Sequence, residues 1–509
     1  MKRALGWLVV LGGICIIGCG EDDTSAGPTS GGGAAGGTAG SGGSAGSGGT
    51  GGSISTGGSG GGEAQWPAYD QSPHVITVAS DMPTLAGRGG IIVHDLDGDG
   101  LLDYVLAAQE NDYGAGRAGI SAYAWDGSVL WFQDDVDIQM NGNSENYGLP
   151  GWSGPGVAAA DVDDDGQAEV VHLNTNNEVV LRNGLDGSIE STLGPFGVPS
   201  GATRWAHLAV ADLRGSGDHD LILQADPLPF RWLKAVRVDT GETLWDFSDY
   251  RGCNHNGFRA ADLDGDGLDE VAGAIMVDDD GTRWNDGWDY RSITGHFDSV
   301  FMYDVKPSVA GIEVIMLEES HVGDDRTAVF NSDELFFYAS RSGDEPQNAA
   351  VGEFDTSVPG LEVWNRSRFD TAQLPWVIDS DGNVIAEWVM NDVKPSDWST
   401  SGIEQINSID WDGGARQYLG AKERHTSGKI GIIDAMDGTF VEVWDEQCDR
   451  IYVVDVAGDA REEMVVVNDA AKEIRVYFNA ATNPNPPKPR LWLKNHYRRQ
   501  KQNYNYYSP

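Results

Sequence analysis

The chain has 509 residues, enough for two or three domains or for one large repeat domain. Its 34 basic and 79 acidic side chains give a formal net charge of −45. General binding to nucleic acid or to an anionic membrane surface needs clustered Lys and Arg, so this charge argues against both kinds of partner. Hydrophobic residues make up 40% of the chain, which is enough for a large core. Beyond the amino terminus, no stretch reaches the roughly 18–20 apolar residues of a membrane span.

The first 65 residues differ in composition from the rest of the chain. Residues 1–18 join a short basic start to an apolar stretch, which predicts a signal peptide. The stretch ends in Ile-Ile-Gly-Cys and resembles the bacterial lipobox, so we expect cleavage before Cys19 and a lipid on its thiol. A plain secretory signal with an incidental Cys19 is the alternative. Gly20 rather than Asp follows this cysteine, which favours a bacterial lipoprotein of the outer membrane or cell surface.

The segment after the signal is a predicted linker. Residues 19–65 are dominated by Gly, Ser, Ala and Thr, which cannot bury a core and behave as flexible coil. We therefore expect a disordered tether, with residues 66–509 as the folded domain. Cys253 and Cys448 lie in this domain, where an oxidising compartment would permit a disulfide. Two buried free thiols are the other interpretation.

Three acidic segments of nine residues share one spacing. Each places side-chain oxygens at positions 1, 3 and 5, a backbone carbonyl at position 7 and a carboxylate at position 9. Ca²⁺ prefers such hard oxygen ligands. Each segment runs into a β-rich stretch rather than the helix of a helical calcium hand. The predicted calcium ligands are Asp95, Asp97, Asp99, Leu101 and Asp103 in the first loop, Asp161, Asp163, Asp165, Gln167 and Glu169 in the second, and Asp262, Asp264, Asp266, Leu268 and Glu270 in the third.

Degenerate copies of this pattern extend the repeat along the chain. In the copy at 212–220, Arg214 and Ser216 replace inner ligands. The eight copies start near residues 95, 161, 212, 262, 304, 353, about 408 and 455. A mean spacing of about 51 residues suits four short strands per unit. Asp-Gly pairs between the copies predict hairpin turns. We therefore expect an all-β fold, an eight-bladed β-propeller with Asp-rich calcium loops.

The strand-flanked acidic loops resemble the FG-GAP and VCBS repeats of β-propellers. A longer run of motifs resembles the rhamnogalacturonan lyases of polysaccharide lyase family eleven, which are eight-bladed propellers with calcium. The resemblance covers most of residues 90–509 in the same order. It rests on Cys253–Asn256, the loop at 262–270, Ala274–Gly281, Gly295–Asp298, Gly311–Val314, Glu318-Glu319, Pro359–Trp364, Gly458–Glu463 and the tail from His496 to Asn505.

The resemblance implies a functional site. In that family, the positions matching His255, His296, Asp298 and Glu319 surround a metal in a central cleft. It also implies catalytic roles for His255, His296 and Tyr504, and substrate binding by Arg498, Asn503 and Tyr504. Each histidine could instead be a hydrogen-bonded structural residue. The tail could instead form a strand that closes the ring, and its basic residues could balance the acidic blades.

Two departures from the family concern cleft cations. The expected Lys falls on Gln447, and the expected Arg falls on Asn348. Arg424, His425 and Lys429 could substitute for them or could form a solvated loop.

The function that the resemblance implies is β-elimination from rhamnogalacturonan or a related uronate glycan. The net charge would repel an acidic polysaccharide, so bound calcium and local basic groups must reverse the field in the cleft. The rival hypothesis is a non-catalytic propeller that binds glycan or protein. A quinone-dependent dehydrogenase is disfavoured, because the repeats are rich in Asp and are not the Trp-rich docking repeats that such propellers carry. We expect a monomer that binds no nucleic acid and meets a membrane only through its lipid anchor.

Overall fold

The structure is a computed structural model. All described residues belong to the unit Gly57–Pro509. The predicted signal peptide, Cys19 and the tether at 19–65 therefore lie outside the described residues. The described ranges are 69–83, 89–110, 117–138, 156–226, 232–252, 258–285, 296–319, 326–340, 346–367, 373–424, 428–484 and 490–502.

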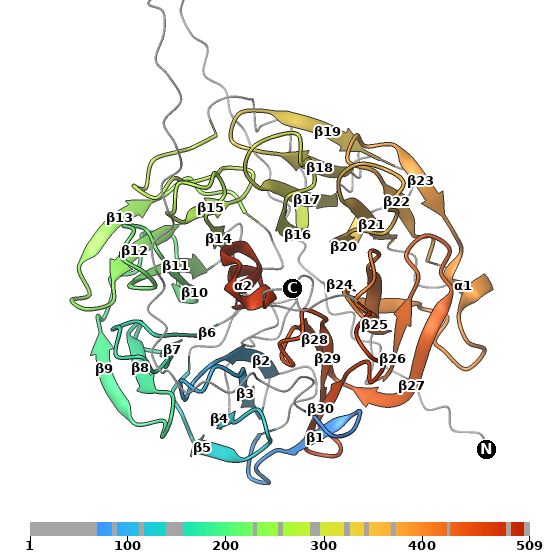
Figure 1. Cartoon of the computed structure of the whole chain (residues 1–509). Helices are drawn as coiled ribbons and strands as arrows, with labels where there is room; N and C mark the ends of the chain where they lie inside the picture. The colour runs from blue at the N-terminus through green and yellow to red at the C-terminus, as the bar shows by residue number, and fades with distance from the viewer. Residues whose placement is uncertain are drawn as a thin grey trace, which may run out of the picture. The chain divides into compact units, whose positions relative to one another are not determined.

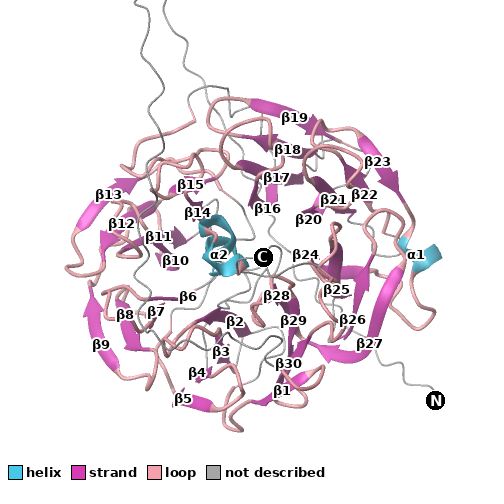
Figure 2. Ribbon diagram, viewed as in Figure 1, coloured by secondary structure: helices cyan, strands magenta, loops and turns pink. Residues whose placement is uncertain are grey.

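Antiparallel sheets follow one another around a ring (Figures 1 and 2). Each sheet is built from consecutive strands, except the last, which takes its outermost strand from the start of the folded unit. Two short α-helices and a 3₁₀ helix accompany the strands in the described part of the chain. The elements are β1 (His74–Thr77), β2 (Gly89–His94), β3 (Asp103–Gln109), β4 (Ala118–Tyr123), β5 (Val129–Asp134), β6 (Val157–Ala160), β7 (Glu169–Leu173), β8 (Val179–Asn183), β9 (Ile189–Leu193), β10 (Arg204–Ala211), β11 (Asp220–Asp226), β12 (Leu233–Arg237), β13 (Thr243–Phe247), β14 (Arg259–Ala261), β15 (Glu270–Ala272), β16 (His296–Tyr303), β17 (Glu313–Glu319), β18 (Arg326–Phe330), β19 (Leu335–Ala339), β20 (Pro346–Gly352), β21 (Glu362–Ser367), β22 (Trp376–Ile378), β23 (Val384–Glu387), α1 (Met390–Val393), β24 (Ile403–Ile409), β25 (Tyr418–Glu423), β26 (Gly428–Ile433), β27 (Phe440–Cys448), β28 (Arg450–Val454), β29 (Glu463–Asn468), β30 (Glu473–Tyr477), the 3₁₀ helix η3 (Leu491–Leu493) and α2 (Asn495–Gln502).

The number of blades differs from the sequence prediction. Seven sheets in the described residues have four strands and form complete blades. At the position of the fourth repeat, β14 and β15 form a sheet of two strands only. The segment after β15 returns through single bridges, Val271 to Val277 and Val277 to Arg283, instead of adding a third strand. The prediction of eight blades is therefore wrong, because a repeated first turn does not ensure that the outer strands of its unit also pair.

The inner strands are apolar on both faces because each lies between two neighbouring blades. In β21, Val363 packs in the cluster shared with the β16–β19 blade, whereas Trp364 packs toward the β24–β27 blade. Both side chains are fully buried. Successive residues of a strand point to opposite faces, so an inner strand needs an apolar run rather than alternation. The core therefore consists of a series of layers between blades.

Asp-Gly turns join the third and fourth strands at the rim, as predicted. Gly187, between β8 and β9, has φ +71, and an added Cβ would lie 2.6 Å from the Trp131 ring of the preceding blade. The Trp131 indole donates a hydrogen bond of 2.7 Å to the Gly184 carbonyl. Gly438 meets Trp388 in the same way, and the Trp388 indole donates to Ala435. Only glycine suits both the positive φ and the close ring, so these turns fix neighbouring blades together.

The two ends of the folded unit close the ring and its centre. β1 pairs with β30 and is the outermost strand of the blade whose inner strands come from the carboxyl-terminal part of the chain. The tail does not form the ring-closing strand in the described residues. Its helix α2 lies inside the ring of innermost strands (Figure 1).

No helix in the described ranges has the length and apolarity needed to cross a membrane.

Candidate functional site

The three complete acidic loops connect the innermost strand of a sheet to the second strand. In each loop, the structure brings three carboxylates together, with one ligand oxygen of each within 4.8 Å of the others. The backbone shapes the first loop, because Gly98 and Gly100 donate hydrogen bonds of 2.8 and 2.9 Å to Asp95. The groups are Asp95, Asp97 and Asp99; Asp161, Asp163 and Glu169; and Asp262, Asp264 and Glu270. The other predicted ligands lie in the same turns outside these groups.

The carboxyl group at position 9 of each loop is buried. Glu270 accepts a hydrogen bond of 2.8 Å from the backbone N–H of Leu263, and Glu169 accepts one of 2.9 Å from Val162. Burial raises the pKa of Glu270 to about 9 and that of Glu169 to about 8. Burial likewise raises the pKa of Asp103 to about 7. A divalent cation would neutralise these groups, and the all-oxygen donor set fits Ca²⁺.

A further acidic group was missed by the sequence analysis. Asp278 and Asp279 bring their carboxylates within the same 4.8 Å limit of Glu270. They lie on the segment that folds back against β15, so only the tertiary structure places them next to the fourth loop. The Asp-Gly pair of this segment forms the predicted turn, in which the Gly281 N–H donates a hydrogen bond of 2.9 Å to the Asp278 carbonyl. Glu270 thus contacts acidic side chains from two separate turns.

The degenerate third loop holds its buried carboxylate with a guanidinium. Arg214 donates through Nε to both oxygens of Asp220, at 2.9 and 3.1 Å, and its Nη2 lies 2.9 Å from the same group. Asp220 is fully buried and corresponds to position 9. Arg214 therefore neutralises a buried carboxylate from a position where the three complete loops have an oxygen-bearing side chain.

In two further loops, the residue equivalent to position 9 has neither the group of close carboxylates nor the arginine partner described above. Glu313 accepts a hydrogen bond from the backbone of Lys306, and Glu362 accepts bonds from Phe354 and Asp355. Burial raises the pKa of each of these two glutamates to about 7. A proton can therefore neutralise the buried group near neutral pH.

Helix α2 lies inside the ring of innermost strands, in the space called the channel below (Figure 1). It lies at the end of this channel that carries the acidic loops, and acidic side chains bind it. Arg499 is fully buried and lies 2.8 Å from Asp218 and 2.7 Å from Asp269. Burial raises the pKa of Asp218, but the Arg499 and Arg498 guanidiniums outweigh it and hold the pKa to about 2. The predicted substrate residue Arg498 lies 3.5 Å from Asp218, and Lys501 lies 3.4 Å from Glu462.

These ion pairs fit the alternative in which the basic tail balances the acidic blades. Asn503 and Tyr504, the other predicted substrate residues, lie outside the described residues.

His296, Asp298 and Glu319, three of the four residues that the resemblance places around a metal, lie toward the opposite end of the channel, where β16 begins. β16 starts at His296, which is in register with Glu319 at the end of β17. Asp298 follows on β16 and is buried. The backbone thus places three of the four predicted residues at one end of one strand pair. His255 lies outside the described residues, so the convergence of all four side chains stays a prediction.

Basic side chains are present near this end of the channel, although not at positions 348 and 447, where the resemblance expects them. Gln447 is exposed on β27, the outermost strand of its blade. A side chain at this position therefore lies away from the channel. Arg366 is fully buried at the end of β21 and donates to Gln347 (2.8 Å) and Glu404 (3.4 Å).

The proposed substitutes for the missing cations differ in their surroundings. Arg424 is 8% exposed and lies 4.0 Å from Glu404, so it is not a solvated residue. Lys429 instead pairs with Asp397 and Asp445, both exposed. His425 lies outside the described residues. Arg366 was missed because a charge within an apolar strand is the only signal for it. Cys448 is a buried free thiol, and Cys253 lies outside the described residues.

Known proteins resemble this chain in sequence. Residues 231–509, more than half of the chain, match the family described as rhamnogalacturonan lyase family 11, C-terminal domain. Rhamnogalacturonan exolyase YesX of Bacillus subtilis strain 168 is 25% identical over 243 residues, which cover 45% of this chain and 37% of YesX. Rhamnogalacturonan endolyase YesW of the same organism is 26% identical over 255 residues, which cover 48% of this chain and 35% of YesW. The matches therefore span little more than a third of these curated relatives.

The fold is also similar to solved structures. The crystal structure of rhamnogalacturonan lyase YesW has a TM-score of 0.63 and 19% identity, and the match covers 86% of this chain and 81% of that one. A Bacillus licheniformis rhamnogalacturonan lyase has a TM-score of 0.62, with the same identity and coverage. The similarity supports the propeller fold, and the family match confirms the resemblance found in the sequence.

Proposed function

We propose, from the premise that this chain belongs to rhamnogalacturonan lyase family 11, that it cleaves rhamnogalacturonan or a related uronate glycan by β-elimination. The proposal concerns the end of the channel where the innermost strands begin. The opposite end holds α2 and its ion pairs with the loops.

One observation carries the proposal. His296, Asp298 and Glu319 belong to two paired strands, and their backbone positions lie at the same end of that pair. Imidazole and carboxylate groups at one site are the residue types that abstract protons and hold divalent cations. Buried Arg366 and Arg424 lie near the same end of neighbouring blades and add positive charge to a strongly acidic protein.

The chemistry assigns a role to each kind of group. A base, His296 or His255, removes the C5 proton of the uronate, and the C4–O bond breaks as a C4–C5 double bond forms. The departing oxygen takes a proton. Negative charge develops on the uronate carboxylate, and Arg366 and Arg424 would stabilise it only in part, because both guanidiniums also face buried Glu404. A divalent cation bound by Asp298 and Glu319 would supply further charge neutralisation.

The decisive experiment measures the ultraviolet absorbance of unsaturated uronate during incubation with rhamnogalacturonan. The wild-type chain should produce the absorbance, and His296→Ala should lower the rate by roughly 10²-fold or more, as expected for loss of a general base. His74→Ala is the matched control, because His74 lies on β1, the outermost strand of its blade. Absence of unsaturated product from wild-type protein in calcium would overturn the lyase proposal.

The rival function is binding without cleavage. Asn348 stands where the resemblance expects an arginine, which favours this outcome. A chain that retains rhamnogalacturonan on an affinity column but releases no unsaturated product would be such a binding propeller.

Two accompanying features are part of the same proposal. The acidic loops hold Ca²⁺ as structural ions, supported by their three groups of close carboxylates. Cys19 carries lipid and residues 19–65 tether a monomeric catalytic domain at the outer membrane or cell surface, supported by the composition of the first 65 residues. Elemental analysis and mass spectrometry of the mature amino terminus test these two features.

A further inference from the structure

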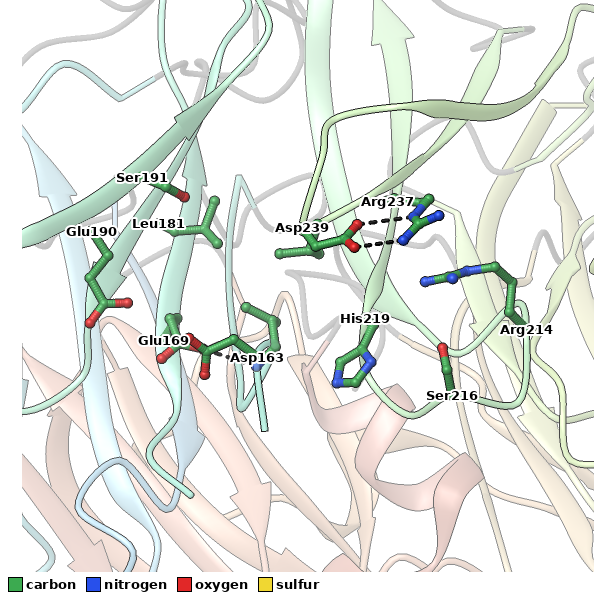
Figure 3. Close-up of a pocket in the computed structure, with 12 residues that line it drawn as sticks. Asp163, Glu169, Leu181, Glu190, Ser191, Arg214, Ser216, His219, Arg237 and Asp239 are labelled. Atoms are coloured by element: carbon green, nitrogen blue, oxygen red, sulfur yellow. Dashed lines mark hydrogen bonds and ion pairs between the residues drawn. The ribbon is translucent and has the colours of Figure 1, made fainter. Parts of the chain in front are cut away.

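A pocket of about 500 Å³ lies between the β6–β9 and β10–β13 blades (Figure 3). It is built from the second and third acidic loops and the outer strands beside them, so it lies apart from the channel end where β16 begins. Its volume falls within the roughly 300–1,000 Å³ of small-molecule sites. The lyase reaction proposed above makes no use of it.

The two walls of the pocket differ in charge. Figure 3 shows Asp163, Glu169 and Glu190 on one side and Arg214, Arg237 and His219 on the other. The basic side chains are themselves paired. Arg237 donates to Asp239 at 2.9 and 2.6 Å, Arg214 holds Asp220, and His219 lies 3.2 Å from Asp164. On the other wall, the calcium ion proposed for the second loop would compensate Asp163 and Glu169. The charges on both walls are thus largely compensated, which favours a ligand without a full charge of its own.

The lining suits a ligand that both donates and accepts hydrogen bonds. Carboxylates only accept hydrogen bonds, and guanidiniums only donate them. A sugar hydroxyl does both, so a sugar ring can satisfy the two walls at once. Val162, Leu181 and Val238 also line the pocket, but they are only 3–5% exposed and offer the C–H face of a ring little apolar surface.

We propose that this pocket is a second glycan site, which binds a neutral sugar residue and does not take part in cleavage. A polysaccharide held there would stay close to the protein, at a pocket that does not include the residues proposed for cleavage. The proposal does not depend on the lyase activity, because a binding propeller could use the pocket equally.

Titration calorimetry in calcium buffer tests the proposal with four probes. They are methyl α-L-rhamnoside and methyl β-D-galactoside, which are neutral, galacturonate, which is anionic, and glucosamine, which is cationic. We expect at least one neutral glycoside to bind more tightly than both charged sugars. The proposal is overturned if neither neutral glycoside binds or if a charged sugar binds best.

A blocking variant then locates the site. Ser191 is exposed on β9, lines the pocket and pairs with Leu181, so Ser191→Trp fills the space. Thr192→Trp is the matched control, because Thr192 is also exposed on β9 but does not line the pocket. Ser191→Trp should weaken binding by at least about tenfold and Thr192→Trp should not.

Ser216→Trp blocks the opposite wall if Ser191→Trp fails to fold. Equal binding by the blocked and control variants would overturn the location. Loss of sugar binding with unchanged release of unsaturated product would separate this site from the lyase site.

Discussion

The second and third acidic loops are neighbours with the same backbone role and different ways of neutralising a buried carboxylate. In the second loop, Asp161 and Asp163 lie close to Glu169, an arrangement for an added cation. In the third loop, Arg214 is already bound to Asp220, the equivalent of Glu169. The buried carboxylate at position 9 can thus be neutralised in different ways, and the repeat does not depend on one particular neutralising group.

Other loops extend this comparison. Glu362 has no such arginine among the contacts described above, and burial raises its pKa to about 7, so a proton can neutralise it. One turn of the repeat thus uses three kinds of neutralisation: a cation in the proposed calcium loops, a guanidinium in the third loop and a proton in the sixth. The following predictions test whether these classes behave differently.

Removal of calcium should have the largest effect. Ca²⁺ bound only by the native state stabilises each occupied loop by about 2.7 kcal/mol at a hundredfold excess over Kd, and three loops have close carboxylate groups. EDTA should therefore lower the melting temperature, and added Ca²⁺ should restore it. Asp264→Ala should lower stability in calcium and have a much smaller effect in EDTA. A melting curve that EDTA leaves unchanged would contradict the proposed calcium loops.

Loss of Arg499 should have the next largest effect. This side chain is fully buried between Asp218 and Asp269. Its removal leaves buried Asp269 without its guanidinium and Asp218 with only the 3.5 Å contact to Arg498, so we expect Arg499→Met to cost about 3–5 kcal/mol, as for other broken buried pairs.

Arg117→Met is the control for Arg499→Met. Arg117 pairs with Glu110 and Asp134 at partly exposed positions, and its loss should cost less than about 1 kcal/mol. Chemical denaturation of the two variants measures the difference. Equal costs would show that α2 does not hold the loops together.

Arg214 should contribute in a way that calcium does not alter. Arg214→Ala leaves Asp220 buried without its cation, and because Arg214 is partly exposed we expect a cost of roughly 2–3 kcal/mol. The cost should be the same in EDTA and in calcium, unlike that of Asp264→Ala.

The variant Arg214→Asp provides the sharper test, because it restores an oxygen ligand at position 3. Its stability should depend on calcium at the third loop, with one more ion per molecule by elemental analysis. If Arg214→Ala and Arg214→Asp respond identically to calcium, the guanidinium does not stand in place of a cation.

The smallest effect should come from Glu362 and should depend on pH. Its folded pKa of about 7 lies above its ordinary value of 4.5, so the folded state binds the proton more tightly. The contribution is complete below pH 4.5 and is lost as the pH rises to about 7. Glu362→Gln keeps the acceptor for Phe354 and Asp355 and removes the titration.

Melting temperatures from pH 4 to 8 measure this difference between wild type and Glu362→Gln. The variant should gain stability relative to wild type as the pH rises. The exposed Glu334→Gln is the control, and parallel curves for wild type and Glu362→Gln would contradict the raised pKa.

Much of the fold could be predicted because its signals are local. The spacing of the acidic residues located the first turn of each repeat, and the Asp-Gly pairs located the rim turns, because both depend on a few consecutive residues. The candidate site could be located only as far as those motifs reached. Asp278 and Asp279 were missed as neighbours of Glu270, because the fold-back that joins them leaves no periodic signal. Buried Arg366 was missed for a similar reason, because its partner Glu404 belongs to another blade.

By itself, the sequence determined the propeller class, the position of its eight repeated turns and the family, since these depend on side-chain pattern and local turn chemistry. Only the tertiary structure decided that one sheet has two strands in the described residues, that β1 closes the last blade and that α2 lies inside the ring. It also decided that Arg214 pairs with buried Asp220, six positions along the chain. Each of these depends on which buried charges and unpaired strand edges meet once the chain has folded, and those contacts join residues that are often hundreds of positions apart.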